Sequence, residues 1–136
     1  MATAPGGFEI EIAAAAPSVP LVRHALRGLL STLDAPDAVV ADIALAVTEA
    51  CTNAVVHAYR NTTGMIEVVA TPDDGVLCVV VRDRGAGITP RVDTPGLGVG
   101  LPVIAAIAMS VEIGSPPGGG TEVRMRFSLA GDAEEA

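Results

Sequence analysis

The segment E-A-C-T-N-A-V-V-H-A-Y, from Glu49 to Tyr59, is the stretch on which the interpretation of this chain depends. Its residues favour a helix, and at 3.6 residues per turn Glu49, Asn53 and His57 then lie along one helical face. A carboxylate, a carboxamide and an imidazole on one face can hold a hard divalent cation and orient a hydroxyl or a water. Because the same residue types also line ordinary solvated helices, the meaning of this set depends on the rest of the chain.

Three glycine-bearing motifs follow this helix: D-R-G-A-G-I (83–88), G-L-G-V-G-L (96–101) and G-G-T (119–121). In the first of them, Asp83 comes directly after an apolar strand. Its carboxylate can accept a hydrogen bond from an exocyclic amine, while the glycines that follow make room for a ring. The alternative is a tight turn in which the Asp83 side chain caps its own backbone.

The other two motifs also have two interpretations each. The glycines of 96–101, placed before a helix, can bring free N–H groups to a phosphate. They do not make a dinucleotide-binding fingerprint, because G-x-G-x-G has the wrong spacing and no strand precedes it. A simple connector is the alternative. G-G-G-T is either a hairpin turn in which Thr121 begins a strand, or a turn that also brings the Thr121 hydroxyl beside Asp83.

Length and composition limit which folds and which partners are possible. The 136 residues are the size of one domain, with an expected ordered core of about residues 8–129. Half of the residues are apolar but only Phe8, Tyr59 and Phe127 are aromatic, so the core must be built from Ala, Val, Leu and Ile. The shortage of aromatic side chains also argues against binding of single-stranded nucleic acid, which depends on stacking.

The net charge and the absence of lysine exclude several further classes of partner and of nucleotide-binding motif. The formal net charge is −8, with eight arginines and no lysine, which makes duplex DNA and anionic lipid poor partners. Without lysine the chain has neither a P-loop nor the eukaryotic protein kinase signature. Nucleotide phosphates would therefore meet backbone N–H groups, a metal or an arginine, and Arg60, Arg84 and Arg91 are the nearest in sequence.

The distribution of apolar residues along the sequence predicts a soluble, cytoplasmic protein. There is no continuous apolar run near 18 residues and no basic segment leading into an apolar one, as a signal peptide requires. Cys51 and Cys78 lack the short spacing of a metal site, so we expect two small buried hydrophobic side chains.

Periodicity and turn residues predict the order βααββ-loop-αββ. This order indicates an α+β, two-layer α/β sandwich with about three helices on one face of a mixed sheet. The run L-C-V-V-V predicts a strand buried on both faces. The expected strands are 8–12, 65–71, 76–82, 110–113 and 122–128, and the expected helices run from about 18 to 34, from 36 to 59 and from Gly98 or Gly100 to 108.

Taken together, the four motifs resemble those of the GHKL ATPase superfamily, which includes gyrase, chaperone, histidine kinase and mismatch-repair ATPases. Within that superfamily, the segment from Glu49 to Tyr59 looks like the N-box of the bacterial anti-sigma-factor serine/threonine kinases. The resemblance spans roughly Phe8 to Leu129, and it implies a histidine-kinase-like ATPase fold.

The resemblance implies a role for each matching residue. Asn53 would ligate Mg²⁺ at the ATP phosphates, and Glu49 would orient or deprotonate the attacking hydroxyl. Asp83 would bind the adenine amino group, assisted by Thr121, and residues 89–98 would form a lid. His57 either approaches the phosphates or is an ordinary half-buried helix histidine. The implied ATP-binding set is Asn53, His57, Asp83, Gly85, Gly87, Gly96, Gly98, Gly100, Leu101 and Thr121.

The resemblance also implies partners. It suggests an anti-sigma factor that binds ATP and Mg²⁺, forms a homodimer, sequesters a sigma factor and phosphorylates a serine or threonine on an anti-sigma factor antagonist. Two alternatives stay open, a non-catalytic ATP-binding interaction module and a detached histidine-kinase ATPase domain. His24 is a poor phosphoacceptor candidate, because the acidic residue and the later proline of such sites are absent from R-H-A-L-R-G-L.

Overall fold

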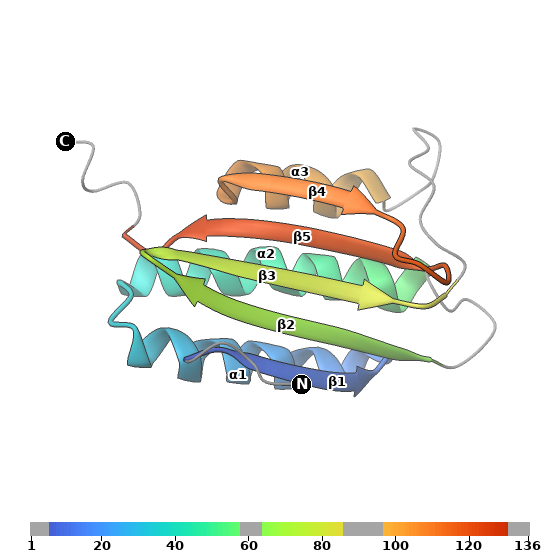
Figure 1. Cartoon of the computed structure of the whole chain (residues 1–136), viewed down its shortest axis with the longest axis horizontal. Helices are drawn as coiled ribbons and strands as arrows, with labels where there is room; N and C mark the ends of the chain where they lie inside the picture. The colour runs from blue at the N-terminus through green and yellow to red at the C-terminus, as the bar shows by residue number, and fades with distance from the viewer. Residues whose placement is uncertain (1–5, 58–63, 86–96, 131–136) are drawn as a thin grey trace.

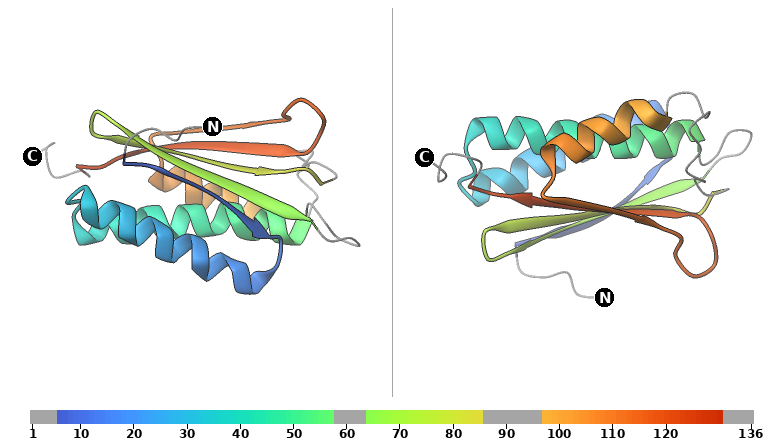
Figure 2. Two further views of the ribbon diagram at one scale, coloured as in Figure 1. Left: turned by 60° about the horizontal axis from the view of Figure 1, so that its bottom comes forward. Right: turned by 90° about the horizontal axis from the view of Figure 1, so that it is seen from above.

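Three α-helices lie on one face of a five-stranded sheet, which gives the two layers that the sequence predicts (Figures 1 and 2). The computed structural model describes residues 6–57, 64–85 and 97–130. Within these ranges the other face of the sheet carries no helix, as the edge-on views of Figure 2 show. The sandwich therefore has one buried interface between its layers and one open sheet face.

The sheet is antiparallel throughout. Its order is β1 (Phe8–Ala13), β2 (Met65–Asp73), β3 (Val76–Asp83), β5 (Thr121–Ser128) and β4 (Ser110–Gly114), and every neighbouring pair is antiparallel. The prediction of a mixed sheet is therefore wrong. Strands β3 and β4 do run in the same direction on either side of the crossover helix. However, β5 lies between them and is antiparallel to both, so no parallel pair forms.

The hairpin between β2 and β3 is tighter than expected, since the predicted strands 65–71 and 76–82 leave four residues between them. Asp74 and Gly75 alone make the turn, with φ values of 52° and 81°. Aspartate and glycine tolerate this left-handed conformation, and a two-residue turn of this kind matches the twist of the strands it joins. Pro72 and Asp73 consequently belong to β2, where Pro72 pairs with Leu77.

The first helix begins after a short 3₁₀ turn, η1 (Ala16–Ser18). Helix α1 (Val19–Thr32) has a proline in its first turn, where the missing N–H group needs no partner. Its buried residues are Val19, Val22, Leu26, Leu29 and Leu30, spaced three or four apart as one helical face requires. Asp34, with a φ of 57°, ends this segment before Pro36.

The remaining two helices carry the motifs. Helix α2 (Asp37–His57) covers the predicted second helix up to His57, and its predicted last residues, 58 and 59, lie outside the described residues. Helix α3 (Leu97–Ile107) begins earlier than expected, so Gly98 and Gly100 are in its first turn and not ahead of it. It packs against α2, which is the central helix of the layer.

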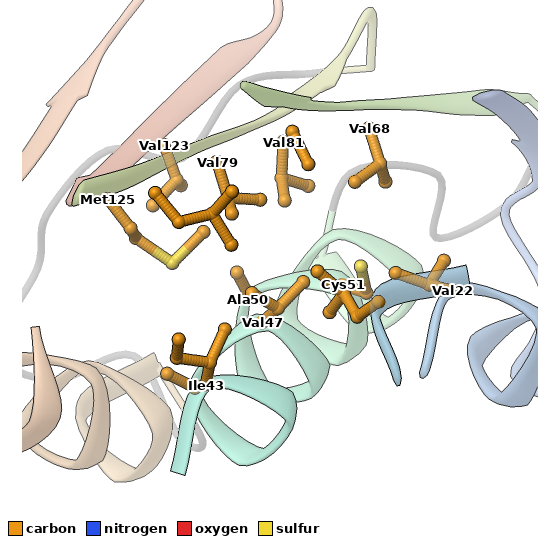
Figure 3. Packing of buried hydrophobic residues seen from close by; sticks show 14 of the residues in the cluster. Val22, Ile43, Val47, Ala50, Cys51, Val68, Val79, Val81, Val123 and Met125 are labelled. Carbon is orange, nitrogen blue, oxygen red and sulfur yellow. The ribbon is translucent and has the colours of Figure 1, made fainter. Parts of the chain in front are cut away.

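The core lies between α2 and the middle strands. Ile43, Val47 and Ala50 of α2 point toward Val79 of β3 and Met125 of β5 (Figure 3). As composition predicts, almost all of this cluster is Ala, Val, Leu and Ile. The largest contribution from one side chain is that of Phe127, which is fully buried.

The two cysteines differ in burial. Cys51 is fully buried in the core, and burial raises the pKa of its thiol to about 12, so it stays neutral and packs as a small apolar group, as predicted. Cys78 lies on the open face of the sheet and is only half-buried. The expectation that the L-C-V-V-V strand is buried on both faces is therefore wrong for Cys78, because the helices cover only the opposite face.

Helix α2 is long and apolar enough to cross a bilayer by length and composition alone, with a mean hydropathy of 1.6 over Asp37–Val56. It is the one helix of the described residues that passes this test. Its buried apolar positions, among them Ile43, Val47 and Ala50, face the sheet and the neighbouring helices, and its exposed side includes Asp37, Asp42 and Leu45. This distribution is typical of the central core helix of a sandwich.

Replacing Phe127 by alanine should cost about 3–5 kcal/mol of unfolding free energy, because it removes the largest fully buried side chain and leaves a cavity. Met109→Ala is the matched control, since Met109 is 60% exposed and its truncation should change stability by less than about 0.5 kcal/mol. Urea unfolding followed by circular dichroism measures both. Equal losses for the two variants would contradict this account of the core.

Candidate functional site

Three polar side chains are buried among the residues whose exposure the structure describes. They are Asn53, Asp83 and Thr121, with exposed fractions of 8%, 3% and 2%. Burying a polar group costs free energy unless it is hydrogen-bonded, so such groups are uncommon in a small core. All three belong to the site predicted from the sequence, where they come from three separate motifs.

The fold brings these motifs to one end of the sandwich (Figure 1). The last turns of α2, the end of β3, the start of β5 and the start of α3 all lie at this end. The reason is the antiparallel topology, because the strand that begins with Thr121 must start where β3 ends. In the register of the two strands, Asp83 and Thr121 are direct partners.

The Asp83 carboxylate is held by the backbone. Its Oδ1 accepts a hydrogen bond from the N–H of Gly85 at 3.0 Å, and the backbone of Thr121 also donates to the carboxylate. The turn in which Asp83 caps its own backbone is therefore present. It does not exclude the functional interpretation, since a carboxylate has about four lone-pair positions and keeps acceptor capacity after two such bonds.

Burial is also the main influence on the ionisation of Asp83. Desolvation raises the pKa of this carboxyl above its ordinary value, and the backbone hydrogen bonds from Gly85 and Thr121 oppose that effect without cancelling it. A carboxyl with a perturbed pKa and fixed orientation, at the end of a strand, is typical of a binding site.

Glu49 and Asn53 lie one turn apart on α2, as their spacing predicts, with Glu49 half-buried and Asn53 buried. Both offer hard oxygen atoms, which suit Mg²⁺. The described residues contain no group of three or more His, Cys, Asp or Glu side chains able to hold a metal ion by themselves. A cation here would thus take most of its ligands from water and phosphate, which is the usual situation of Mg²⁺ in nucleotide sites.

The predicted phosphate-binding backbone is the N-terminus of α3. The first N–H groups of a helix have no partner inside it, and they favour anions. Gly98, Gly100 and Leu101 all lie in the first two turns of α3, and Leu101 is half-buried. His57 is the last described residue of α2.

Several residues predicted for the site lie outside the part of the chain that the structure describes. They are Gly87, Gly96, Arg60, Arg91 and most of the expected lid, residues 89–98. Of the candidate cations, Arg84 is described, and its side chain is exposed. These expectations stay predictions.

Gly120 is a site residue that the sequence interpretation missed. Its φ is 93°, and a Cβ added there would overlap the carbonyl oxygen of Asp83 and lie 2.8 Å from the Cα of Arg84. Only glycine allows this approach, which places Thr121 beside Asp83. The signal was available in the three consecutive glycines before Thr121, although it does not show which of them makes the contact.

Comparison with known protein families gives a match that spans most of the chain. The family described as the histidine kinase-like ATPase domain matches residues 12–127. The chain belongs to this family. The fold expected from the four motifs is that of the family, and the described candidate site residues all lie inside the matched region.

Curated relatives are similar along nearly their whole length. An anti-sigma F factor of Clostridium acetobutylicum is 29% identical over 134 residues, which cover 90% of this chain and 94% of the relative. An anti-sigma F factor of Caldanaerobacter subterraneus is 34% identical over 114 residues, covering 76% of this chain and 80% of the relative.

A solved structure has the same fold. It contains the RsbU and RsbW domains of Rv1364c from Mycobacterium tuberculosis, with a TM-score of 0.68 and 27% identity. The similarity covers 90% of this chain but 31% of that protein, so this chain corresponds to less than a third of its length.

Gly120→Ala should lower the unfolding free energy by about 3 kcal/mol or more, because backbone strain and the overlap with Asp83 add together. Gly118→Ala is a matched control. Its φ of 91° imposes similar strain, but an added Cβ meets no atom within 4 Å, so the loss should be about 1–2 kcal/mol. Urea unfolding compares the two. If they lose the same amount, the contact with Asp83 is unimportant.

The raised pKa of Asp83 predicts a dependence of stability on pH. Its contribution favours folding below the unfolded pKa, near 3.8, and is lost as the pH rises through the higher folded pKa. Asp83→Asn removes this dependence, so the variant should gain stability relative to wild type between pH 4 and pH 7. Urea titrations across this range test it, with the exposed Asp73→Asn variant as the control for removing one carboxylate. A difference that shrinks with rising pH would contradict the prediction.

Proposed function

We propose that this chain is an anti-sigma factor that binds ATP with Mg²⁺ and phosphorylates a serine or threonine of an anti-sigma factor antagonist. The observation that carries the proposal is the burial of Asn53, Asp83 and Thr121, three polar side chains that the motif resemblance assigns to an ATP site. The similarity to anti-sigma F factors over most of the chain supports the regulatory role.

In this proposal, the strand end recognises the nucleobase. The carboxylate of Asp83 accepts a hydrogen bond from the exocyclic amine of adenine, and the hydroxyl of Thr121 adds a second polar contact. Burial strengthens both interactions, because little water competes for these groups. Gly85 and Gly120 keep side chains away from the ring edge.

The helices hold the phosphates and the metal. N–H groups in the first turn of α3 would donate to phosphate oxygens, and the amide oxygen of Asn53 would hold Mg²⁺. When bound, Mg²⁺ neutralises charge on the phosphates. The chain has no lysine side chain to bind the phosphates, which favours this division.

In this proposal, Glu49 is the general base. It lies one turn before Asn53 and remains half-exposed, so a hydroxyl of a partner protein can reach it. Its carboxylate accepts the hydroxyl proton while the hydroxyl oxygen forms a bond to the γ-phosphorus. The bond to the leaving oxygen breaks, and ADP is released.

The proposed partners are a sigma factor and the antagonist. The proposed assembly is a homodimer, and the proposed compartment is the cytoplasm. The net charge of −8 favours protein partners over nucleic acid or an anionic membrane.

The roles of Glu49 and Asn53 can be separated by experiment. Asn53→Ala should lose Mg²⁺-dependent ATP binding in calorimetry, because a metal ligand is removed. Glu49→Gln should keep ATP binding but transfer phosphate to a recombinant antagonist about a hundredfold more slowly or worse, because the base is removed. Asp42→Asn, on an exposed position of the same helix, is the control and should match wild type in both assays.

The outcomes distinguish the alternatives. Transfer by Glu49→Gln at the wild-type rate would contradict the role of Glu49. ATP binding by wild type without any transfer would indicate a non-catalytic module, and acid-labile phosphate on a target histidine would indicate a histidine kinase domain.

A further inference from the structure

A network of ion pairs crosses the open face of the sheet. Nη1 of Arg82, on β3, contacts Oε1 of Glu67 on β2 at 3.0 Å. Nε of the same arginine contacts Oε1 of Glu122 on β5 at 2.8 Å. The second carboxylate oxygen of Glu122 accepts from Nη2 of Arg124 at 2.9 Å. One guanidinium thus joins three neighbouring strands, and Arg124 fixes one of its two partners.

This network lies directly behind the candidate nucleobase site. Glu67, Arg82 and Glu122 are partners in the sheet register. The next row along the strands is Ile66, Asp83 and Thr121, whose side chains face the opposite side, since residues alternate along a strand. The ion pairs therefore join the same three strands as the site, one residue away from it.

Glycines are concentrated in the backbone next to these strand ends. Gly118, Gly119 and Gly120, immediately before Thr121, all have φ between 91° and 100°, and glycine restricts the backbone least of all residues. After Asp83 the sequence continues as R-G-A-G. Hydrogen-bonded pairing also ends here, because Asp83 and Thr121 are the last paired residues of β3 and β5.

We propose that Arg82 is a positioning residue for nucleobase recognition, holding β2, β3 and β5 together so that Asp83 and Thr121 keep the spacing that an exocyclic amine requires. This inference rests on the proposed ATP site. Arg82 acts through the strands and does not contact the nucleotide, because its side chain is on the opposite face of the sheet.

The ionisation of the network supports a persistent restraint. Hydrogen bonds with Arg82 lower the pKa of both Glu67 and Glu122, and those carboxylates raise the pKa of Arg82 in turn. A single partly exposed ion pair contributes little to stability. Loss of Arg82 should therefore have a small effect on the free energy of unfolding. It should have a larger effect on the preference for adenine, because a small change in the spacing of Asp83 and Thr121 weakens a hydrogen bond to the exocyclic amine.

Calorimetry with ATP and with inosine triphosphate, which carries a carbonyl in place of the exocyclic amine, tests the inference. Arg82→Met should weaken ATP binding about fivefold and change binding of inosine triphosphate by less than about twofold. Arg82→Lys keeps the charge without the planar fork and should be intermediate, which also gives a second folded variant. Arg126→Met is the control, since Arg126 is exposed on the same face of β5 and lies in none of the ion pairs described above.

A double variant sharpens the test. In an Asp83→Asn background, Arg82→Met should cause no further loss of ATP affinity, because both act on one interaction. Equal weakening of ATP and inosine triphosphate, or an unchanged preference for ATP, would overturn the inference alone. Absence of ATP binding by wild type would overturn the proposed function and this inference with it.

Discussion

The pairing of Asp83 with Thr121 is the interaction on which the candidate site depends. It places a carboxylate with 3% exposure at the end of β3, where burial disfavours its charge. The backbone groups of Gly85 and Thr121 offset that cost by donating hydrogen bonds. This compensation requires the two strands to meet closely, and the absence of a side chain on Gly120 makes the contact possible. The site is thus a property of strand pairing as much as of the polar residues themselves.

The sandwich separates two kinds of chemistry. Strands β3 and β5 contribute the groups suited to a nucleobase, while α2 and α3 contribute those suited to phosphates, metal and proton transfer. The core between the layers links them, since Val47 and Ala50 of α2 pack near Val79 and Val81 of β3 (Figure 3). Because these residues are close-packed, the helix cannot shift without moving the strands. The relative position of the two halves is therefore fixed by apolar packing.

The two faces of the sheet differ in how they are stabilised. The inner face is held by burial of Ile66, Val68, Val79 and similar side chains, whereas the outer face carries charged residues that bridge strands. The outer network lies behind the polar row of the inner face, where apolar packing is interrupted by Asp83 and Thr121. The ion pairs join β2, β3 and β5 one residue away from that row.

The sequence by itself determined the element types and the core composition, and it singled out Asn53, Asp83 and Thr121 as candidate site residues, because periodicity, turn residues and motif spacing are local properties. Only the tertiary structure decided that the sheet is antiparallel, that Cys78 lies on an open face and that Gly120 contacts Asp83. These features depend on which strand enters between two others and which face the helices cover. Such choices follow from the packing of the whole chain, where contacts between residues distant in sequence are made, and no single segment encodes them.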